Sequence, residues 1–320
     1  MARKFKGPIF GPFFFKVDKP KGITSFDVIR QFKRKLPKNI GKIGHFGTLD
    51  PFATGLMVIG IGPATRLNQY TQVSTKEYIA SGRLGFLSPT GDFDTEDGTM
   101  ERVEIPPLSY ENVKEALESF VGPYMQSPPA FSATKHEGKP LHEWAREGII
   151  IEKPPVERHI HDIELLSFEG DTVIFRVSVS SGTYIRVLFD DLAIKLGTRG
   201  ALEELRRTNS AGIDLDGSIK LDIFNDDDFD FREFLLNHAQ PITDLINFQL
   251  LELDDKDALS FANGMTIKRE NETDGLYWVR SNNQTLGLGA IDEGKLKVKV
   301  GFSPAALDKI DLTICNSLDE

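Results

Sequence analysis

Residues 41–55 restrict the fold more than any other stretch of the chain. They read GKIGHFGTLDPFATG, with four glycines and a proline directly after Asp50. Glycine lets a backbone turn sharply or approach another group closely, and proline holds the residue before it in extended or turn geometry. The apolar run 56–61 follows at once. The pattern predicts a stiff, irregular loop that presents Asp50 just before a buried strand.

Strand-like and helix-like segments are interspersed before residue 220. Strands are predicted at residues 13–17, 56–61, 76–84, 156–168 and 172–179. Helices are predicted at residues 25–36, 141–147, 184–196 and 202–207. A further helix is predicted to begin after Ser109, which caps it. The Gly-, Pro- and Asp-rich segment 85–98 is predicted to be an exposed loop. These elements indicate an α+β fold with a mixed, largely antiparallel sheet and flanking helices.

The composition changes twice further along the chain. Residues 221–257 carry eleven acids against two basic residues, and short strands and turns follow from about residue 250. We therefore predict a catalytic domain over 1–225, an acidic linker and helix over 226–247, and a small β-rich domain over 248–320. Lysines at 295, 297 and 299 alternate with apolar residues, as in a half-buried strand. The proline-punctuated segment 124–152 is predicted to be a mobile insertion.

Cysteine content and hydropathy restrict the kinds of cross-link, metal site and cellular location that are expected for the protein. The 320 residues include one cysteine, Cys315, so a disulfide framework within the chain and cysteine-rich zinc sites are excluded. Histidine spacing indicates no other metal site. No apolar stretch approaches the length of a membrane span. A cytoplasmic location is expected.

The net charge of −10 is unevenly distributed. Residues 1–50 hold twelve Lys or Arg against three acids. Such asymmetry indicates one face that attracts a polyanion, although a basic run can also be only a solvated helix face.

Five segments together resemble the TruB-type pseudouridine synthases. The string from Gly44 to Gly55 is similar to the family's G-TLDP-ATG signature. In the family's order the chain also has Lys19-Pro20-Lys21-Gly22-Ile23-Thr24-Ser25, Lys76-Glu77-Tyr78, Gly182-Thr183-Tyr184-Ile185-Arg186 and Leu205-Arg206-Arg207-Thr208. The resemblance covers about residues 12–215, and residues 248–312 look like the PUA-like domain often appended in this family. Phe46 departs from the pattern, since many relatives have a small polar residue there, and the change is expected to alter RNA contacts.

The resemblance implies a cofactor-free isomerisation of uridine to pseudouridine at position 55 in the T-arm of tRNA. Asp50 is the implied catalytic residue, and Tyr78 is expected to stack on the uracil. Arg186 is the natural partner of Asp50, because a guanidinium binds a carboxylate in a bidentate fork and stays charged. Tyr184 and Leu205 are expected to line the uracil pocket. A carboxylate can attack C1′ or remove the C2′ proton to give a glycal, and both routes stay open.

RNA contacts are expected from His45 and from the basic N-terminal region. His45 would lie where the flipped base leaves the RNA stack. Phosphate contacts are expected from Lys19, Lys21, Arg30, Lys33, Arg34, Lys35, Lys38 and Lys42. The insertion 124–152 is a candidate clamp on the T-arm, and a monomer is expected.

Two other functions fit parts of the same pattern. A tRNA-binding chaperone without catalysis would use the same basic face and PUA-like domain. A guide-RNA-dependent synthase would share the G-T-L-D-P string, but that branch tends to continue with K-V-T-G, where this chain has Phe52-Ala53-Thr54-Gly55. The stand-alone branch, which uses no guide RNA, is therefore favoured.

Overall fold

The computed structural model describes residues 12–37, 40–71, 75–95 and 99–302. The chain forms two compact units. Unit 1 comprises Met1–Asp50, Leu56–Gln72 and Leu215–Glu320, and unit 2 comprises Pro51–Gly55 and Val73–Asp214. None of the helices formed by the described residues has both the length and the hydropathy needed to cross a lipid bilayer.

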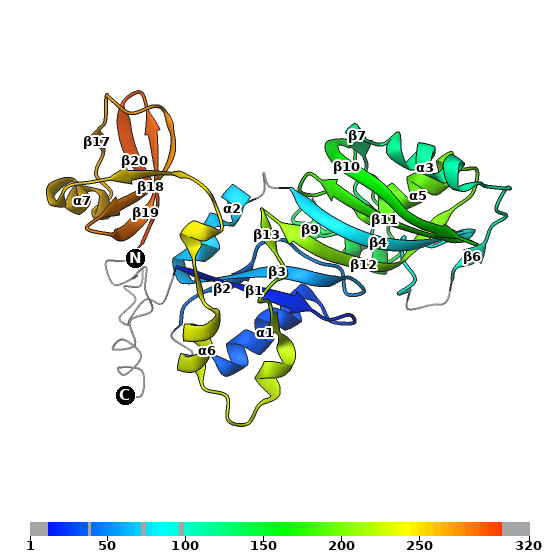
Figure 1. The fold of residues 1–320 in the computed structure, drawn as a ribbon, viewed down its shortest axis with the longest axis horizontal. Helices are drawn as coiled ribbons and strands as arrows, with labels where there is room; N and C mark the ends of the chain where they lie inside the picture. The colour runs from blue at the N-terminus through cyan, green and yellow to red at the C-terminus, as the bar shows by residue number, and fades with distance from the viewer. Residues whose placement is uncertain (1–11, 38–39, 72–74, 96–98, 303–320) are drawn as a thin grey trace. The chain divides into compact units, whose positions relative to one another are not determined.

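The first part of unit 1 consists of sheet strands and the helices packed beside them (Figure 1). Its strands are β1 (Phe13–Lys19), β2 (Ile43–His45), β3 (Thr54–Ile61), β14 (Ile219–Lys220) and β15 (Gln240–Pro241). Strand β1 lies between β14 and β3, with β14 parallel to it, and β2 runs antiparallel to β3. The helical elements are α1 (Ser25–Lys35), η1 (Gly62–Leu67), α2 (Asn68–Thr71), η2 (Leu221–Asn225), α6 (Phe231–His238) and η3 (Ile242–Asp244).

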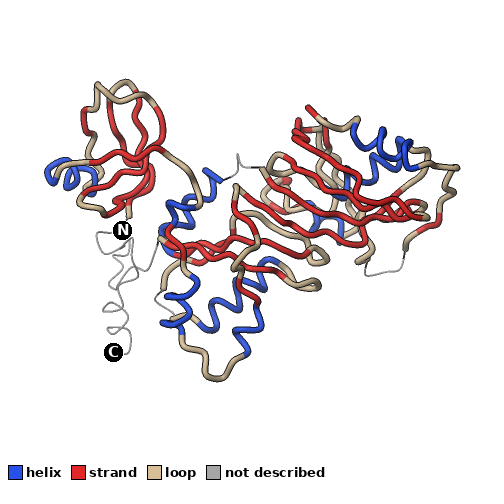
Figure 2. Tube along the Cα trace, in the orientation of Figure 1, coloured by secondary structure: helices blue, strands red, loops and turns tan. Residues whose placement is uncertain are grey.

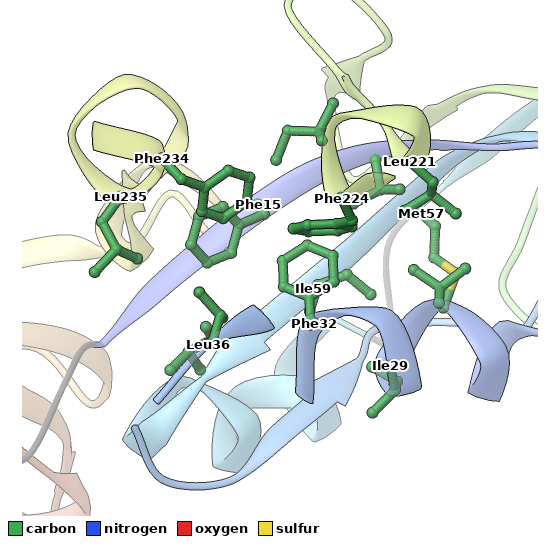
Figure 3. Close-up of a cluster of buried hydrophobic side chains, with 14 of the residues drawn as sticks. Phe15, Ile29, Phe32, Leu36, Met57, Ile59, Leu221, Phe224, Phe234 and Leu235 are labelled. Carbon is green, nitrogen blue, oxygen red and sulfur yellow. The ribbon is translucent and has the colours of Figure 1, made fainter. Parts of the chain in front are cut away.

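A cluster of buried apolar side chains joins β1, β3, β14, α1, η2 and α6 (Figure 3). The Phe32 ring of α1 lies edge-on to Phe224 of η2 at 4.9 Å between centroids, and Phe15 of β1 stacks on Phe234 of α6 at 5.4 Å. Each such pair adds about 0.5–1.5 kcal/mol to the burial of the rings. The acidic stretch therefore contributes apolar side chains to this core, while Asp222 and Asp226 are exposed.

Helix α1 confirms the helix predicted at residues 25–36. Thr24 is the N-cap, its hydroxyl accepts from the Asp27 N–H, and the Asp27 side chain accepts from the Thr24 N–H. This reciprocal arrangement is a capping box. Ser25 is therefore available for a contact elsewhere, which matters for the loop that carries Asp50.

The end of the described chain confirms the predicted small β-rich domain. It contains β16 (Gln249–Glu252), α7 (Asp255–Ala262), β17 (Ile267–Lys268), β18 (Gly275–Ser281), β19 (Gln284–Asp292) and β20 (Lys295–Gly301). The sheet order is β16-β18-β19-β20-β17. Phe261 of α7 packs with Tyr277, Val279 and Leu296 on one face, and the predicted half-buried strand at the three lysines is β20.

The described residues of unit 2 form an antiparallel sheet and three helices (Figure 2). Its strand order is β12-β4-β11-β10-β7, and every neighbouring pair is antiparallel. The elements are β4 (Lys76–Leu84), β5 (Phe86–Leu87), β6 (Glu101–Arg102), α3 (Tyr110–Glu118), β7 (Gly122–Gln126), β8 (Lys135–His136), β9 (Lys139–Pro140), α4 (Leu141–Arg146), β10 (Val156–Glu169), β11 (Thr172–Val179), α5 (Ile185–Lys195), β12 (Gly200–Ser210) and β13 (Ile213–Asp214). Most predicted strands and helices of this region are confirmed, and the α+β class is confirmed with them.

The helix predicted at 202–207 is wrong, because these residues belong to β12. Leu202 and Leu205 are both buried, and their spacing of three is typical of a helix face. A β-bulge between Leu202 and Glu204 produces the same spacing in a strand. The bulge inserts one extra residue, so Leu202 opposite Gly82 and Leu205 opposite Ala80 face the same side.

Candidate active site

The loop before Asp50 is fastened to helix α1 through one serine. The hydroxyl of buried Ser25 accepts a hydrogen bond from the Leu49 N–H at 2.9 Å and donates to the Leu49 carbonyl at 3.0 Å. Leu49 and Phe46 are themselves buried, and the Phe46 N–H donates to the Val58 carbonyl at 2.9 Å. Asp50 is half-buried. The predicted stiff loop therefore has a specific physical basis, since both its backbone and its apolar side chains are held.

Gly55 is required where the chain enters β3. Its φ is +98°, and a Cβ there would lie 2.3 Å from the carbonyl O and 2.8 Å from the N of Arg207. Gly55 pairs with Arg207 in the parallel ladder between β3 and β12. No side chain fits between two backbones at that distance, so the last glycine of the 41–55 string is explained by close packing.

Tyr78 and Leu205 share one face of the unit 2 sheet. Tyr78 lies opposite Val177 and Arg207, and Leu205 lies opposite Ala80, two residues from Tyr78 on β4. Because directly paired residues and alternate residues of a strand point to the same side, these side chains lie on one face.

Helix α5 covers that same face. Its Phe189 fills the space above Gly82, where a Cβ would meet the ring at 2.4 Å. Phe189 also stacks on Phe175, which lies opposite Ala80. The start of α5, with Tyr184 and Arg186, is therefore carried on the side of the sheet that bears Tyr78.

Tyr184 is clamped at the N-cap of α5. Its N–H donates to Gln126 Oε1 at 2.8 Å, and Gln126 Nε2 donates to its carbonyl at 3.0 Å. Its hydroxyl lies 3.1 Å from Thr134 Oγ1. Gln126 is buried, and a single glutamine carries no sequence signal for this role.

Arg186 is buried in a cage of acceptors. Nη2 donates to the Phe131 carbonyl at 3.0 Å, and Nη1 donates to the Thr90 carbonyl. Nη1 also lies 3.6 Å from Oδ2 of Asp92, and both side chains of this ion pair are less than a tenth exposed. Asp92 Oδ1 in turn accepts from Thr90 Oγ1 at 2.8 Å and from the Asp94 N–H at 3.1 Å.

The prediction of an exposed loop at 85–98 is therefore wrong at Asp92 and Phe86, which are buried. The polar composition of the segment suggested solvent, but its carbonyls and Asp92 serve a buried guanidinium instead. Gly91 (φ +77°) permits the close approach, since a Cβ there would lie 3.1 Å from the Arg186 Cβ.

Comparison with known proteins identifies the family. A model described as TruB family pseudouridylate synthase (N terminal domain) matches residues 33–185. The chain is 36% identical to tRNA pseudouridine synthase B of Thermosipho melanesiensis over 79% of its own length and 89% of the relative's. It is 44% identical to the enzyme of that name from Protochlamydia amoebophila, over 63% and 76% of the two lengths. The chain belongs to the TruB family. It is therefore an isomerase of the pseudouridine synthase type.

Two solved structures share the fold of this TruB family member. One is an H/ACA RNP bound to a substrate RNA containing 2′-deoxyuridine, with a TM-score of 0.67, 23% identity, and coverage of 92% of this chain and 86% of that one. The other is a Cbf5-Nop10-Gar1 complex, with a TM-score of 0.66, 24% identity, and coverage of 93% and 87%. At such identities the likeness concerns the fold alone.

The TruB motif residues are divided between the two units. Asp50 and His45 belong to unit 1, whereas Tyr78, Tyr184, Arg186 and Leu205 belong to unit 2. The unit 2 residues are brought to one sheet face and the start of one helix. The pairing of Asp50 with Arg186 stays a prediction. His45 is half-buried at the end of β2.

Two residues of the TruB resemblance have surroundings that differ from those expected. Lys19 is fully buried, and its ammonium donates to the Pro20 carbonyl at 3.0 Å and the Ile23 carbonyl at 2.7 Å. This placement favours organisation of the loop before α1 over the predicted phosphate contact. Phe46 is 5% exposed and its ring fills the space above Gly60, so its side chain is part of the core.

The other basic residues are mostly available to a polyanion. Lys21, Arg30, Lys33, Arg34 and Lys42 are exposed, whereas Lys38 lies outside the described residues. Lys35 donates to the Asp226 carbonyl at 2.9 Å. In the described part of the chain, no three His, Cys, Asp or Glu side chains are grouped so as to hold a metal ion.

Proposed function

We propose that this protein converts uridine to pseudouridine at position 55 in the T-arm of tRNA, acting on the RNA without a guide. The TruB family membership and the similarity to proteins named tRNA pseudouridine synthase B support tRNA as the substrate. The observation that carries the proposal is the Ser25–Leu49 anchor, which fixes the backbone next to Asp50. A reactive group must be held in place to use proximity and orientation.

Asp50 acts as the nucleophile or base on the ribose. The reaction breaks the bond from N1 of uracil to C1′ and forms the bond from C5 to C1′, and the proton on C5 is lost while N1 gains one. A carboxylate can trap the electron-poor C1′ as an ester, or it can remove the C2′ proton to give a glycal. Both routes conserve atoms and electrons without a cofactor.

Tyr78 supplies a flat surface for the detached uracil. It is 7% exposed on the face that α5 covers. A ring in such a position stacks on a base and brings its hydroxyl near C5, where a proton must leave. Leu205 and Tyr184 complete the apolar surroundings of the base.

Arg186 keeps Asp50 ionised, so that the carboxylate can attack C1′ or take the C2′ proton. Asp92 and the carbonyls of Thr90 and Phe131 fix the direction of the guanidinium. An arginine carries five N–H donors, so a guanidinium can serve such a cage and a further carboxylate together.

The target base has to leave the folded RNA before it can react. Flipping costs a few kcal/mol and leaves a gap in the stack, which His45 is proposed to fill. Exposed Lys21, Arg30 and Lys33 supply phosphate contacts, and residues 124–152 close on the T-arm.

The test uses the full-length chain and an unmodified tRNA transcript, with pseudouridine mapped chemically. We expect modification at uridine-55 by the protein alone, and loss of at least about 10³-fold in the single-turnover rate for Asp50→Asn with RNA affinity retained. Full activity of Asp50→Asn would reject Asp50 as the catalytic group. Binding without any pseudouridine formation by the unaltered chain would support the chaperone alternative, and activity only after a guide RNA is added would support the guided one.

A further inference from the structure

Lys76 is a half-buried cation that the mechanism above does not use. It is the first residue of β4, and its ammonium donates to Ser181 Oγ at 3.1 Å. An ammonium carries three N–H donors. Within the described chain, Ser181 is its hydrogen-bond partner and no carboxylate forms an ion pair with it.

Lys76 lies on the proposed uracil-binding face. It is two residues before Tyr78, so the two side chains point to the same side, about 6.6 Å apart along a strand that rises about 3.3 Å per residue. Its cross-strand partners on that face are Val179 and Ser210, which are uncharged. Ser181 directly precedes the Gly182–Arg186 motif.

The charge that acts on Lys76 is the cation of Arg207. Buried Arg207 lies opposite Tyr78, and Arg158 of β10 donates to the Ser181 carbonyl at 3.4 Å. Glu77 points to the opposite face, where it accepts from Thr208 Oγ1 at 2.7 Å and pairs with Arg176 at 3.3 Å. Burial and the charge of Arg207 lower the pKa of Lys76 to about 8.

An ammonium in such surroundings destabilises the folded chain until an anion arrives. Desolvation disfavours its charge, and a neighbouring cation disfavours it further. A ligand with a negative charge would reverse both effects. Functional sites commonly retain groups of this kind at a cost in stability.

We propose that Lys76 binds a phosphate group of the RNA strand beside the flipped uridine. The inference rests on the proposed function, because the RNA reaches this face only when its uracil lies against Tyr78. Lysine suits the role, since it binds phosphate as a point charge and needs no fork geometry.

The test measures RNA affinity against salt for full-length chains that also carry Asp50→Asn, so that no turnover occurs. Unmodified tRNA transcript is the probe, and Lys76→Met is compared with Lys76→Arg. The matched control is Lys114→Met, which removes an exposed lysine of α3 in the same unit. We expect Lys76→Met to weaken binding about tenfold at low salt and to reduce the slope of log K against log[salt] by about 0.7–0.9, the value of one phosphate contact.

Lys76→Arg and one further variant, Ser181→Ala, separate a ligand contact from a structural role. Lys76→Arg should keep the slope, and Ser181→Ala should keep it too, because the ammonium is proposed to act directly on RNA. Lys76→Met should have a melting temperature no lower than that of the parent. An unchanged slope in Lys76→Met would overturn the proposal. It would indicate that the ammonium contacts the uracil or stabilises the fold. A slope lost equally in Ser181→Ala would overturn it as well, since Lys76 would then act through Ser181.

The outcome is separable from that of the proposed function. Pseudouridine formation is measured with the unaltered Asp50 chain, whereas the salt slopes are measured without turnover. Failure of the first rejects the reaction, and failure of the second rejects only the Lys76 contact.

Discussion

Arg186 and Asp92 form a buried ion pair in unit 2, with Nη1 3.6 Å from Oδ2. The pair links Arg186, in the family motif at the start of α5, to Asp92 in a polar loop. The sequence did not predict a role for that loop. Asp92 is itself held by Thr90 and by the Asp94 N–H. The guanidinium is thus oriented by a residue outside the five segments that resemble the family.

Asp92→Asn removes the charge from this pair and keeps the shape of the side chain. We expect the single-turnover rate of pseudouridine formation to fall about 10²-fold, the effect of a misplacement of about 1 Å, with RNA affinity nearly unchanged. Asp92→Ala should in addition lower the free energy of unfolding by about 3–5 kcal/mol, because it leaves a buried charge unpaired. Urea unfolding and quench-flow kinetics measure the two effects, and an Asp92→Asn chain with the parent rate would contradict the orienting role.

Ser25→Ala removes both hydrogen bonds to the Leu49 backbone. The buried N–H and carbonyl then lack partners, so the free energy of unfolding should fall by about 1–3 kcal/mol. The reaction rate should fall as well, because the backbone beside Asp50 is released.

Thr24→Ala is the matched control for that loss. It removes the N-cap of the same helix and should cost about 1 kcal/mol of stability. Its reaction rate should stay close to that of the parent, because the hydroxyl of Thr24 caps the helix and is not the group that binds the loop carrying Asp50. Equal rates for Ser25→Ala and Thr24→Ala would show that the anchor has no part in catalysis.

Gly55→Ala tests the close packing between β3 and β12. Its Cβ would meet two backbone atoms of Arg207, so we expect a chain destabilised by more than about 3 kcal/mol or unable to fold. Gly122→Ala is a control with a similar φ of +107° and open space around the added Cβ. It should lose only about 1–2 kcal/mol, the cost of the left-handed backbone. Thermal unfolding followed by circular dichroism compares the two, and similar losses would contradict the packing argument.

Lys76 should make stability rise with pH. Its pKa is lowered from 10.5 to about 8 in the folded chain. Between these two values the unfolded chain binds more protons, so the free energy of unfolding increases with pH across that window. The penalty is complete below about pH 8 and disappears above about 10.5.

Lys76→Met should therefore raise the melting temperature at pH 7, and the gain over the parent should shrink as the pH approaches 10. The measurement is a series of calorimetric scans of both chains from pH 6.5 to 10. A difference between them that does not change with pH would exclude titration of Lys76 as its source.

Local sequence determined most elements of this protein. Strands at 76–84, 156–168 and 172–179 and helices at 25–36 and 184–196 follow from hydrophobic period and capping residues, which act over a few neighbours. The 41–55 string allowed the family to be predicted for a similar reason. A sharp turn, a close backbone approach and a carboxylate on a stiff loop each require particular residue types at neighbouring positions.

Contacts between distant residues decided the rest. Leu202 and Leu205 have helical spacing, and only pairing with β4 across a bulge makes them a strand. Asp92 in a polar loop and Lys19 in a basic run were expected at the surface, and the burial of their charges depends on Arg186 and on the carbonyl of Ile23. The contact of Ser25 with Leu49 likewise depends on the folded chain. Hydrogen bonds and ion pairs between distant residues leave no periodic pattern in the sequence. The partners of these side chains can therefore be identified only in the folded chain.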